Sequence, residues 1–273
     1  MRKLVINMEL GFEKTAEEMI RAIAKTGWDG VFTDWYENGE NVKIAKQVRE
    51  AGLMYQSVHA PFDKCHYLWE DEEKGEEEYL RLVRCMRDCA DIEVPLVIMH
   101  AIIGMKRNTP TELGVERFSK LLDEARRLGI KIAVENTEGE CYLDRIMQDL
   151  HNHPALGFCI DTGHEMCVNY SHDLITKYGD KLIATHLNDN MKMTGDEITW
   201  FDDSHMMPFD GLADWQNIAA RLKNVGYKGP LTFELERRNK PERHTHDIYE
   251  NLNAEEFLTL ALDKARKFRE LAD

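Results

Sequence analysis

The sequence is short of the features that would place it at a membrane or divide it into several domains. Its 273 residues contain no apolar run near the roughly 18 residues that a membrane-spanning helix needs. No low-complexity linker and no shift in composition interrupts the chain. The first ten residues hold a brief apolar stretch broken by Asn7 and Glu9, which predicts a strand and not a secretory signal. We therefore expect a single domain over residues 1–273 that makes no membrane contact.

Paired cysteines and an excess of basic residues are missing as well. The six cysteines form no Cys-x-x-Cys pair, and without a secretory signal we expect reduced, mostly buried thiols in a cytoplasmic protein. Lys and Arg number 35 against 50 Asp and Glu, so the net charge is −15. Duplex binding draws affinity from Lys and Arg that neutralise phosphates, so this balance disfavours a nucleic-acid partner. A local basic groove stays compatible with that total.

What the sequence does contain is a regular alternation of two patterns. Eight short apolar runs, typical of buried strands, alternate with amphipathic stretches of helical period. The runs are 4–8, 30–33, 53–58, 96–99, 130–134, 156–160, 182–185 and 231–233, and the helical stretches lie near 16–26, 40–51, 76–91, 111–128, 141–151, 165–178, 214–225 and 254–271. Such alternation favours right-handed βαβ units and a parallel sheet. Eight units predict a single (β/α)₈ TIM barrel, which typically takes about 250 residues.

A His or a carboxylate follows each of the eight predicted strands. These residues are Glu9, Asp34, His59, His100, Glu135, Asp161, His186 and Glu234. In a barrel the carboxyl ends of the strands meet at one face, so the side chains should form one cluster. Crowded carboxylates repel one another and would take up protons, a conflict that a divalent cation removes. Carboxylate and imidazole ligands suit Mn²⁺, Zn²⁺, Co²⁺ or Fe²⁺, whereas Mg²⁺ prefers mostly oxygen.

Each of these residues has a plainer interpretation when it is taken singly. A lone His at a strand end is more often a hydrogen-bonded structural residue, and a lone Glu is more often a salt-bridge partner. Their joint occurrence favours a metal site, most of all for the four residues Glu135, Asp161, His186 and Glu234. The connections 60–76 and 188–213 are long, and long loops on this side of a barrel usually carry function.

Several of the strand ends lie in segments that resemble the xylose-isomerase-like TIM barrel superfamily. The segments are Val134-Glu135-Asn136, Ile160-Asp161-Thr162-Gly163-His164, His186-Leu187-Asn188-Asp189, Phe233-Glu234-Leu235-Glu236 and Ser57-Val58-His59-Ala60-Pro61. The superfamily includes sugar phosphate isomerases and epimerases, hydroxypyruvate isomerases, inosose dehydratases and AP endonucleases of the endonuclease IV type. The resemblance covers essentially the whole chain, with its motifs in the right order and spacing.

The resemblance implies a metal centre whose composition differs between branches of the superfamily. In the sugar-handling members one divalent ion is held by residues that match Glu135, Asp161, His186 and Glu234, and the residue that matches His164 helps to hold substrate. In the endonuclease members three zinc ions are held by a set that also includes residues matching His59, His100, His164, Asp203 and His205. This sequence retains all of these residue types. We therefore expect one divalent ion (Mn²⁺, Zn²⁺, Co²⁺ or Mg²⁺), and more than one is compatible with the sequence.

Two departures from the superfamily concern the substrate side of the site. Many relatives have Pro-Gly-x-Gly where this chain has Pro208-Phe209-Asp210-Gly211. Some epimerases carry an Arg six residues after the seventh-strand His. Here Lys192 occupies that position, and it keeps the charge but loses the bidentate fork. We expect five residues to contact substrate, namely His59, His100, His164, Lys192 and Trp35.

These observations predict a sugar or sugar phosphate isomerase or epimerase that acts on a small carbohydrate. The metal would bind a carbonyl and its neighbouring hydroxyl and stabilise the enediolate that forms when the carbon between them loses a proton. Glu135 and Glu234 would move that proton as well as serve as ligands, a dual use that the resemblance implies. The alternatives are a metal-dependent phosphodiesterase of the endonuclease IV type and a keto-inositol dehydratase. A homodimer is compatible with the sequence.

Overall fold

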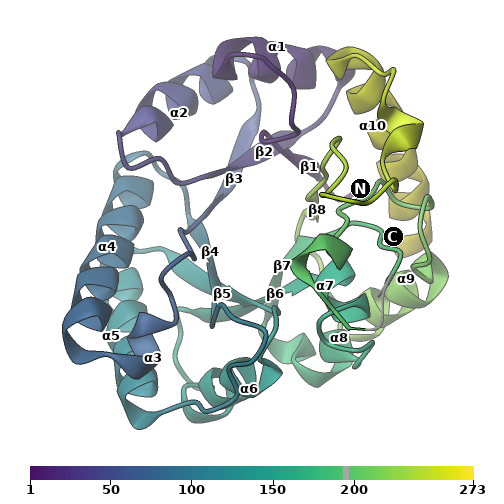
Figure 1. Cartoon of the computed structure of the whole chain (residues 1–273). Helices are drawn as coiled ribbons and strands as arrows, with labels where there is room; N and C mark the ends of the chain where they lie inside the picture. Colours follow the sequence, from purple (N-terminus) through teal and green to yellow (C-terminus); the bar gives the residue numbers. More distant parts are fainter. Residues whose placement is uncertain (193–196) are drawn as a thin grey trace.

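The computed structural model describes residues 1–192 and 197–273 and shows the eight-stranded barrel that the alternating pattern predicts (Figure 1). The strands are β1 (Leu4–Asn7), β2 (Gly30–Asp34), β3 (Met54–His59), β4 (Leu96–His100), β5 (Lys131–Glu135), β6 (Leu156–Asp161), β7 (Leu182–His186) and β8 (Leu231–Phe233). Neighbouring strands pair in parallel in the order β7-β6-β5-β4-β3-β2-β1-β8. Each predicted strand is therefore present, and the fold class is confirmed.

The barrel closes between β7 and β8 by a pairing that is less regular than the other seven. One parallel bridge joins Leu187 to Phe233, just beyond the end of β7. The Leu187 N–H donates to Thr232 O at 2.8 Å, and the Glu234 N–H donates to Leu187 O at 3.3 Å. Below them the Thr232 N–H donates to the side-chain hydroxyl oxygen of Thr185 at 3.0 Å. At the β7–β8 seam, one side chain thus replaces a backbone acceptor.

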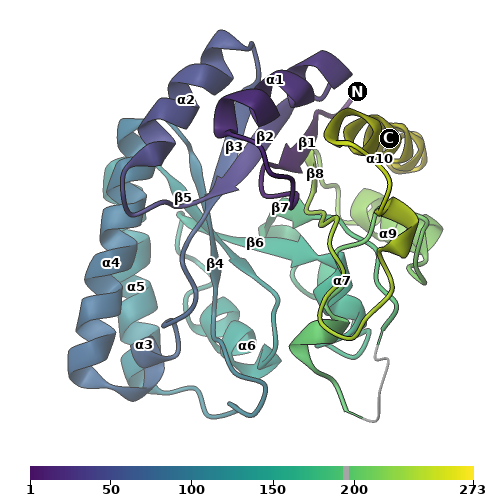
Figure 2. The same ribbon diagram turned by 45° about the horizontal axis from the view of Figure 1, so that its top comes forward.

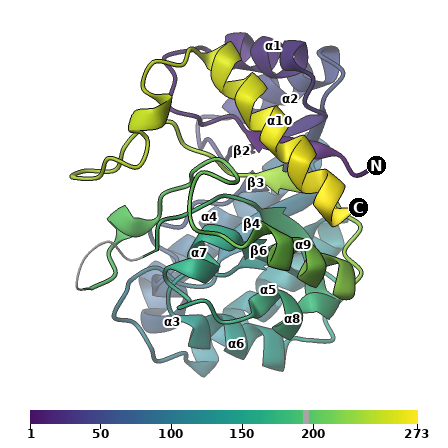
Figure 3. The same cartoon turned by 90° about the vertical axis from the view of Figure 1, so that its right-hand side faces the viewer.

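The helices surround the strands on the outside of the barrel, as two further views show (Figures 2 and 3). Their bounds are α1 (Ala16–Thr26), α2 (Glu40–Glu50), α3 (Tyr67–Glu70), α4 (Glu72–Asp91), α5 (Glu112–Leu128), α6 (Glu140–Asp149), α7 (Thr162–Met166), α8 (Leu174–Lys177), α9 (Trp215–Asn224) and α10 (Ala254–Ala272). At α1 the Thr15 side chain accepts from the Glu18 N–H while the Glu18 carboxylate accepts from the Thr15 N–H, a reciprocal cap. Gly27 ends that helix at a φ of 97°, which a residue with a side chain rarely adopts.

The predicted helix over 165–178 is wrong as a continuous element. The structure has two short helices there, α7 and α8, which are separated by residues 167–173. Tyr170 and Ser171 both have positive φ angles, 54° and 61°, and this conformation ends a helix. The Glu165 side chain accepts from the Leu174 N–H at 3.0 Å and thereby fixes the turn between the two helices. Tertiary contacts, and not local propensity, break the predicted helix.

The connection over 60–76 also contains more regular structure than expected. It holds the short helix α3, and the long helix α4 begins within it at Glu72. The Asp71 side chain caps α4 by accepting a hydrogen bond from the Lys74 N–H at 2.8 Å. Trp28 and Trp215 are both buried. All six cysteines are free thiols, and Cys141 alone is not fully buried. In the part of the chain that the structure describes, every helix is too short or too polar to cross a membrane.

Candidate metal centre

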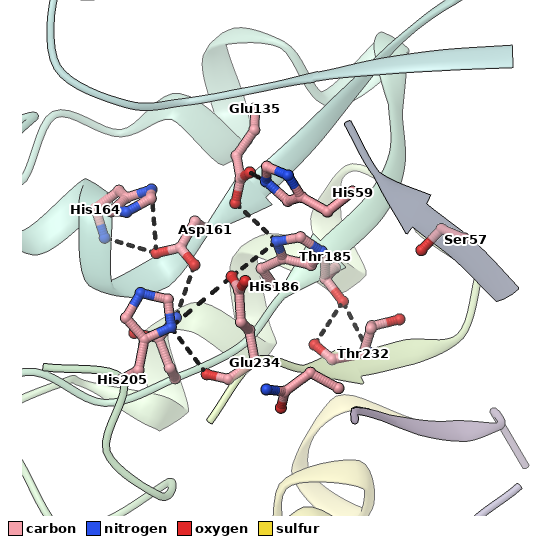
Figure 4. Close-up of polar contacts among 12 residues, drawn as sticks. Ser57, His59, Glu135, Asp161, His164, Thr185, His186, His205, Thr232 and Glu234 are labelled. Carbon is pink, nitrogen blue, oxygen red and sulfur yellow. Dashed lines mark hydrogen bonds and ion pairs between the residues drawn. The ribbon is translucent and has the colours of Figure 1, made fainter. Parts of the chain in front are cut away.

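Four of the strand-end residues meet at the carboxyl end of the barrel (Figure 4). Glu135, Asp161 and His186 are the last residues of β5, β6 and β7, and Glu234 directly follows β8. Each offers a donor atom, and the four atoms lie within 4.8 Å of one another. His186 Nδ1 is 2.8 Å from Glu135 Oε1 and 2.9 Å from Glu234 Oε2. The barrel therefore assembles the predicted set of four, here called the tetrad.

Two further donor groups lie beside the tetrad. The first shares Glu135, whose Oε2 is 3.2 Å from His59 Nε2 and 3.3 Å from His100 Nε2. The second comprises His164, Asp203 and His205, and Asp203 Oδ2 is 3.2 Å from His164 Nε2 and 2.8 Å from His205 Nε2. In each group the donor atoms lie within 4.8 Å of one another. Apart from the group that Cys159 forms with Glu135 and His186, the nine residues thus divide into three sets of donors, two of which share one carboxylate.

Backbone carbonyl groups orient most of these imidazoles. The Nδ1–H groups of His59, His164 and His205 donate to Ala60 O, Asn136 O and Glu234 O at 2.8, 2.9 and 3.3 Å. This leaves the Nε2 atom of each ring facing the carboxylates, the arrangement that fixes a ligand's tautomer in metal sites. The Asp161 carboxylate is held in turn, because Asn188 Nδ2 donates to its Oδ2 at 2.7 Å.

Carboxylates and imidazoles perturb each other strongly within the cluster. Burial alone would raise the pKa of Glu135, but the imidazoles of His186, His100 and His59 hold it well below its usual value. Glu234 follows the same pattern, and its pKa falls to about 2. Burial of Asp161, which has fewer compensating contacts, raises its pKa to about 6. Burial would lower the pKa of His205, yet Asp203 and Glu234 raise it to about 9. Such opposed shifts are typical of functional sites.

The donor chemistry fits divalent transition ions. Imidazole nitrogen and carboxylate oxygen in sets of three and four are the ligands that Zn²⁺, Mn²⁺ and Co²⁺ take in proteins. One atom points to the same conclusion independently. Asp203 Oδ1 is buried and has no hydrogen-bond partner in the described residues, although a buried carboxylate oxygen normally has one. The residues present therefore suit a metal at the tetrad, and the two flanking groups could hold additional ions.

A cavity of about 370 Å³ opens above the donor groups. Its lining includes Asp34, His59, His100, His164, Asp203, His205 and Glu234 from the strand-end side. Its other wall is largely apolar and includes Phe62, Ile103, Met105, Val168, Trp200 and Phe201. A small cavity with polar groups on one side and apolar side chains on the other is the usual form of a small-molecule site.

The structure adds one cation to this cavity that the sequence interpretation missed. Lys240 lines the cavity, and its Nζ is 2.7 Å from Glu236 Oε2. Burial would lower the pKa of this lysine, but Glu236 raises it, so the ammonium stays charged. Glu236 and Lys240 are four residues apart, a spacing typical of ion pairs on a helix, yet they lie in the loop after β8. This spacing is the one feature of the sequence that could have indicated the ion pair.

Two of the predicted substrate contacts lie apart from this cavity. Trp35 is buried, and its indole N–H donates to Asp88 Oδ2 on α4 at 2.9 Å. Lys192 is exposed and lines a different cavity, between α7 and α9, together with Arg221 and Asp214. The remaining predicted contacts, His59, His100 and His164, do line the cavity above the donor groups.

Comparison with known proteins places the chain in a family. Residues 20–254 match the family described as xylose isomerase-like TIM barrel. The chain belongs to this family. The 3-keto-D-glucoside 4-epimerase of E. coli has a similar structure, with a TM-score of 0.72 at 16% identity, covering 99% of this chain and 100% of the epimerase. At that identity the likeness shows the fold alone, and the resemblance stated from the motifs is confirmed at the level of the family.

Three curated proteins are similar to this chain in sequence, and the chain spans about a third of the length of two of them. An uncharacterized protein, y4fM, of Sinorhizobium fredii is 32% identical over 38% of this chain, which spans only 33% of that protein. A 3-dehydroshikimate dehydratase of Pseudomonas putida is 22% identical over 81% of the chain and 36% of the dehydratase. A probable endonuclease 4 of Mycoplasma capricolum is 24% identical over 66% of the chain and 71% of that protein. The proteins to which this chain is similar thus include an epimerase, a dehydratase and a probable endonuclease.

Proposed function

We propose that this protein is a divalent-metal-dependent isomerase or epimerase of a small carbohydrate. The observation that carries the proposal is the tetrad, whose donor atoms lie within 4.8 Å of one another at a cavity of about 370 Å³. A cavity of this size accepts a sugar or a sugar phosphate. The 3-keto-D-glucoside 4-epimerase with the same fold supports this class of reaction.

The tetrad residues Glu135, Asp161, His186 and Glu234 would hold the ion. A divalent ion bound there would supply Lewis acidity toward a carbonyl and an adjacent hydroxyl, so that the carbon between them loses a proton more readily to give an enediolate. His59, His100 and His164 line the cavity and would hold substrate hydroxyl groups. The apolar wall with Phe62 and Trp200 would cover a sugar's apolar face and limit the access of water.

The two predicted proton carriers differ in their access to substrate. The Glu135 side chain is 0% exposed, and imidazoles occupy both of its oxygens, whereas the Glu234 side chain is 21% exposed and lines the cavity. We therefore assign proton transfer first to Glu234. Asp34 is the carboxylate that faces the cavity from β2, on another side, and no hydrogen bond engages its side chain in the described residues. It is the second candidate to give or take a proton.

Solvent deuterium exchange tests the proposal directly. The Mn²⁺-loaded protein is incubated in D₂O with ketoses, keto acids and keto-inositols, and each compound is followed by NMR. We expect deuterium next to a carbonyl in at least one compound, and loss of that signal in Glu234→Gln. Glu242→Gln, an exposed residue of the same loop, is the control and should keep the activity. Absence of exchange across the whole panel would contradict the proposal, and loss of water from a keto-inositol would identify a dehydratase.

A second function is favoured by the two flanking donor groups. One ion accounts for the tetrad alone, whereas three ions would use all nine residues, as the resemblance to endonucleases of the endonuclease IV type implies. The similarity to a probable endonuclease 4 of Mycoplasma capricolum supports considering this function. Metal analysis separates the two functions, because the isomerase needs one ion per chain and the phosphodiesterase needs three. Three ions per chain together with cleavage of an abasic-site oligonucleotide would favour the second function.

A further inference from the structure

A second cavity, of about 610 Å³, lies at the same end of the barrel between the loops that follow β1 and β8. It is lined by Gly11, Phe12, Glu13, Lys14, Arg237, Arg238, Leu252, Asn253 and Ala254. None of these residues belongs to the three donor groups. Figure 3 shows the loop before α10, in yellow, projecting from the end of the barrel opposite the chain termini.

The charge of this cavity is opposite to that of the whole protein. Lys14, Arg237 and Arg238 line it, with Glu13 as the one carboxylate among the lining residues, in a chain whose net charge is −15. None of the three cations forms an ion pair within residues 1–192 and 197–273, although most other arginines of the chain do. Arg238 alone among the arginines has neither an ion pair nor a hydrogen bond in that part of the structure. Its guanidinium is free to bind an anion.

Arg237 is held in place by packing and by a backbone carbonyl, and not by a carboxylate. The guanidinium carbon of Arg237 lies 4.9 Å from the centre of the Phe12 ring, which in turn packs edge-to-face on Phe257 at 5.6 Å. Arg237 Nη2 donates to Glu250 O at 2.9 Å, while its buried Nε has no partner in the described residues. A cation restrained in this way loses little conformational freedom when it binds a ligand.

Gly11 allows Arg238 to lie across the β1 loop. A Cβ atom at position 11 would lie only 3.2 Å from Arg238 Cγ and Nε, and the glycine has a φ of 80°. The first turn of α10 borders the cavity, and the Asn253 side chain already accepts from the N–H groups of Glu255 and Glu256. The charged groups that an anion would meet here are the side chains of Arg237, Arg238 and Lys14.

We propose that this cavity binds a phosphate group. Two guanidinium groups and an ammonium match the charge and the several acceptor oxygens of a phosphate dianion, and guanidinium binds phosphate through two parallel hydrogen bonds. Arg237 is three residues beyond Glu234, so the two Cα atoms are at most roughly 11 Å apart. A phosphate bound by these side chains is either the far end of a sugar phosphate bound at the tetrad or part of a separate ligand. The proposal holds whichever reaction the tetrad performs.

Calorimetric titration of the metal-loaded chain with inorganic phosphate tests the site. We expect Arg238→Gln to weaken phosphate binding about tenfold, as the loss of one charge-assisted hydrogen-bonded pair implies. Arg266→Gln removes an exposed arginine from α10 and should change the affinity less than about twofold, within the usual effect of a surface substitution. Phosphate that binds at the metal centre contributes equally to the titrations of the wild type and the two variants, so it does not affect the comparison between them. Equal phosphate affinity in the wild type and Arg238→Gln would overturn the proposal.

A second titration distinguishes the two sources of the phosphate. D-fructose 6-phosphate and D-fructose are compared in the wild type and in Arg238→Gln. If the phosphorylated sugar alone loses affinity in the variant, the phosphate belongs to the molecule at the tetrad. If inorganic phosphate loses affinity while both sugars bind unchanged, the cavity holds a separate phosphate. Either result supports an anion site, and neither depends on whether the tetrad catalyses deuterium exchange.

Discussion

Glu135 is a buried carboxylate that links the tetrad to the imidazoles of His59 and His100. Its two oxygens contact three imidazoles, those of His186, His59 and His100, at 2.8 to 3.3 Å. No other residue of the cluster belongs to both the tetrad and the His59 group. Replacement of this residue should therefore disturb metal binding more than replacement of Asp161, which contacts fewer imidazoles.

Glu9, two residues beyond the end of β1, has a pKa that links the stability of the fold to pH. Burial and then the charge of Asp34 raise the pKa of Glu9 to about 8, although the Tyr36 hydroxyl donates a hydrogen bond to it. The folded protein thus holds a proton that the unfolded chain releases near pH 4.5. The stability of the fold should fall as the pH rises from about 4.5 to about 8, because the native state binds the extra proton over that range.

We predict that Glu9→Gln removes this decline. The neutral amide keeps an acceptor for the Tyr36 hydroxyl but cannot ionise, so the variant should gain roughly 2–4 kcal/mol over the wild type at pH 9 and little at pH 5. Urea unfolding at the two pH values measures the difference. Glu13→Gln, in the exposed part of the same loop, is the control. A gain of the same size at both pH values would contradict the explanation.

Sequence alone was sufficient for most of the residues at strand ends and insufficient for the residues beside them. Glu9, two residues beyond β1, belongs to none of the three donor groups and does not line the cavity above them. Strand ends converge by the geometry of a parallel barrel, so the positions of Glu135 and His186 in the sequence suffice to bring them together. Trp35 directly follows such an end, yet the path of its loop turns the indole away to Asp88 on α4. Lys192 lies outside the cavity and Lys240 lines it for the same reason, because loop paths depend on tertiary contacts that no short motif encodes.

At the scale of elements, a side-chain hydroxyl supplements the backbone hydrogen bonds of the β7–β8 seam. The Thr232 N–H is buried and donates to the Thr185 hydroxyl oxygen at 3.0 Å, in place of a backbone carbonyl. We predict that Thr185→Val costs about 1–3 kcal/mol of unfolding free energy, because that N–H loses its acceptor. Thermal and urea unfolding measure the loss.

The partner strand offers a matched control. The Thr232 hydroxyl is buried and has no hydrogen-bond partner in the described residues. Thr232→Val has the same shape and removes an unsatisfied group, so it should be neutral or slightly stabilising. Equal losses in the two variants would show that packing, and not the hydrogen bond, holds the seam.

The ends of the helices were predictable where residues close in the sequence form the cap. They were not predictable where contacts with distant residues determine where a helix ends. Thr15 and Glu18 cap α1 within four residues, so the start of that helix can be read from the sequence. The interruption between α7 and α8 depends on Glu165, whose carboxylate is held by Arg221 of α9 at 2.7 Å. That ion pair joins residues 56 positions apart, and helical periodicity carries no information about it.

At the scale of the whole molecule, the barrel separates charge by position. The chain is strongly acidic, yet unpaired cations collect at the loops after β1 and β8, on the face that also carries the donor groups. An acidic exterior repels polyanions such as duplex nucleic acid, whereas a local cationic cavity can still hold one small anion. With the phosphate site that we propose, this arrangement would favour a small phosphorylated ligand over a polyanion.

The seam also determines what a bound ion would do to the motions of the barrel. His186 ends β7 and Glu234 follows β8, and their side chains meet across the seam at 2.9 Å. An ion held by both residues would fasten the two ends of the sheet together. Opening of the seam would require its release. At a Zn²⁺ concentration 100 times the Kd, amide hydrogen exchange in peptides covering 182–187 and 231–235 should slow by about 100-fold. Amide exchange in α5, on the side of the barrel opposite the seam, should change little. Equal slowing in α5 would mean that the ion stabilises the whole barrel and not the β7–β8 seam in particular.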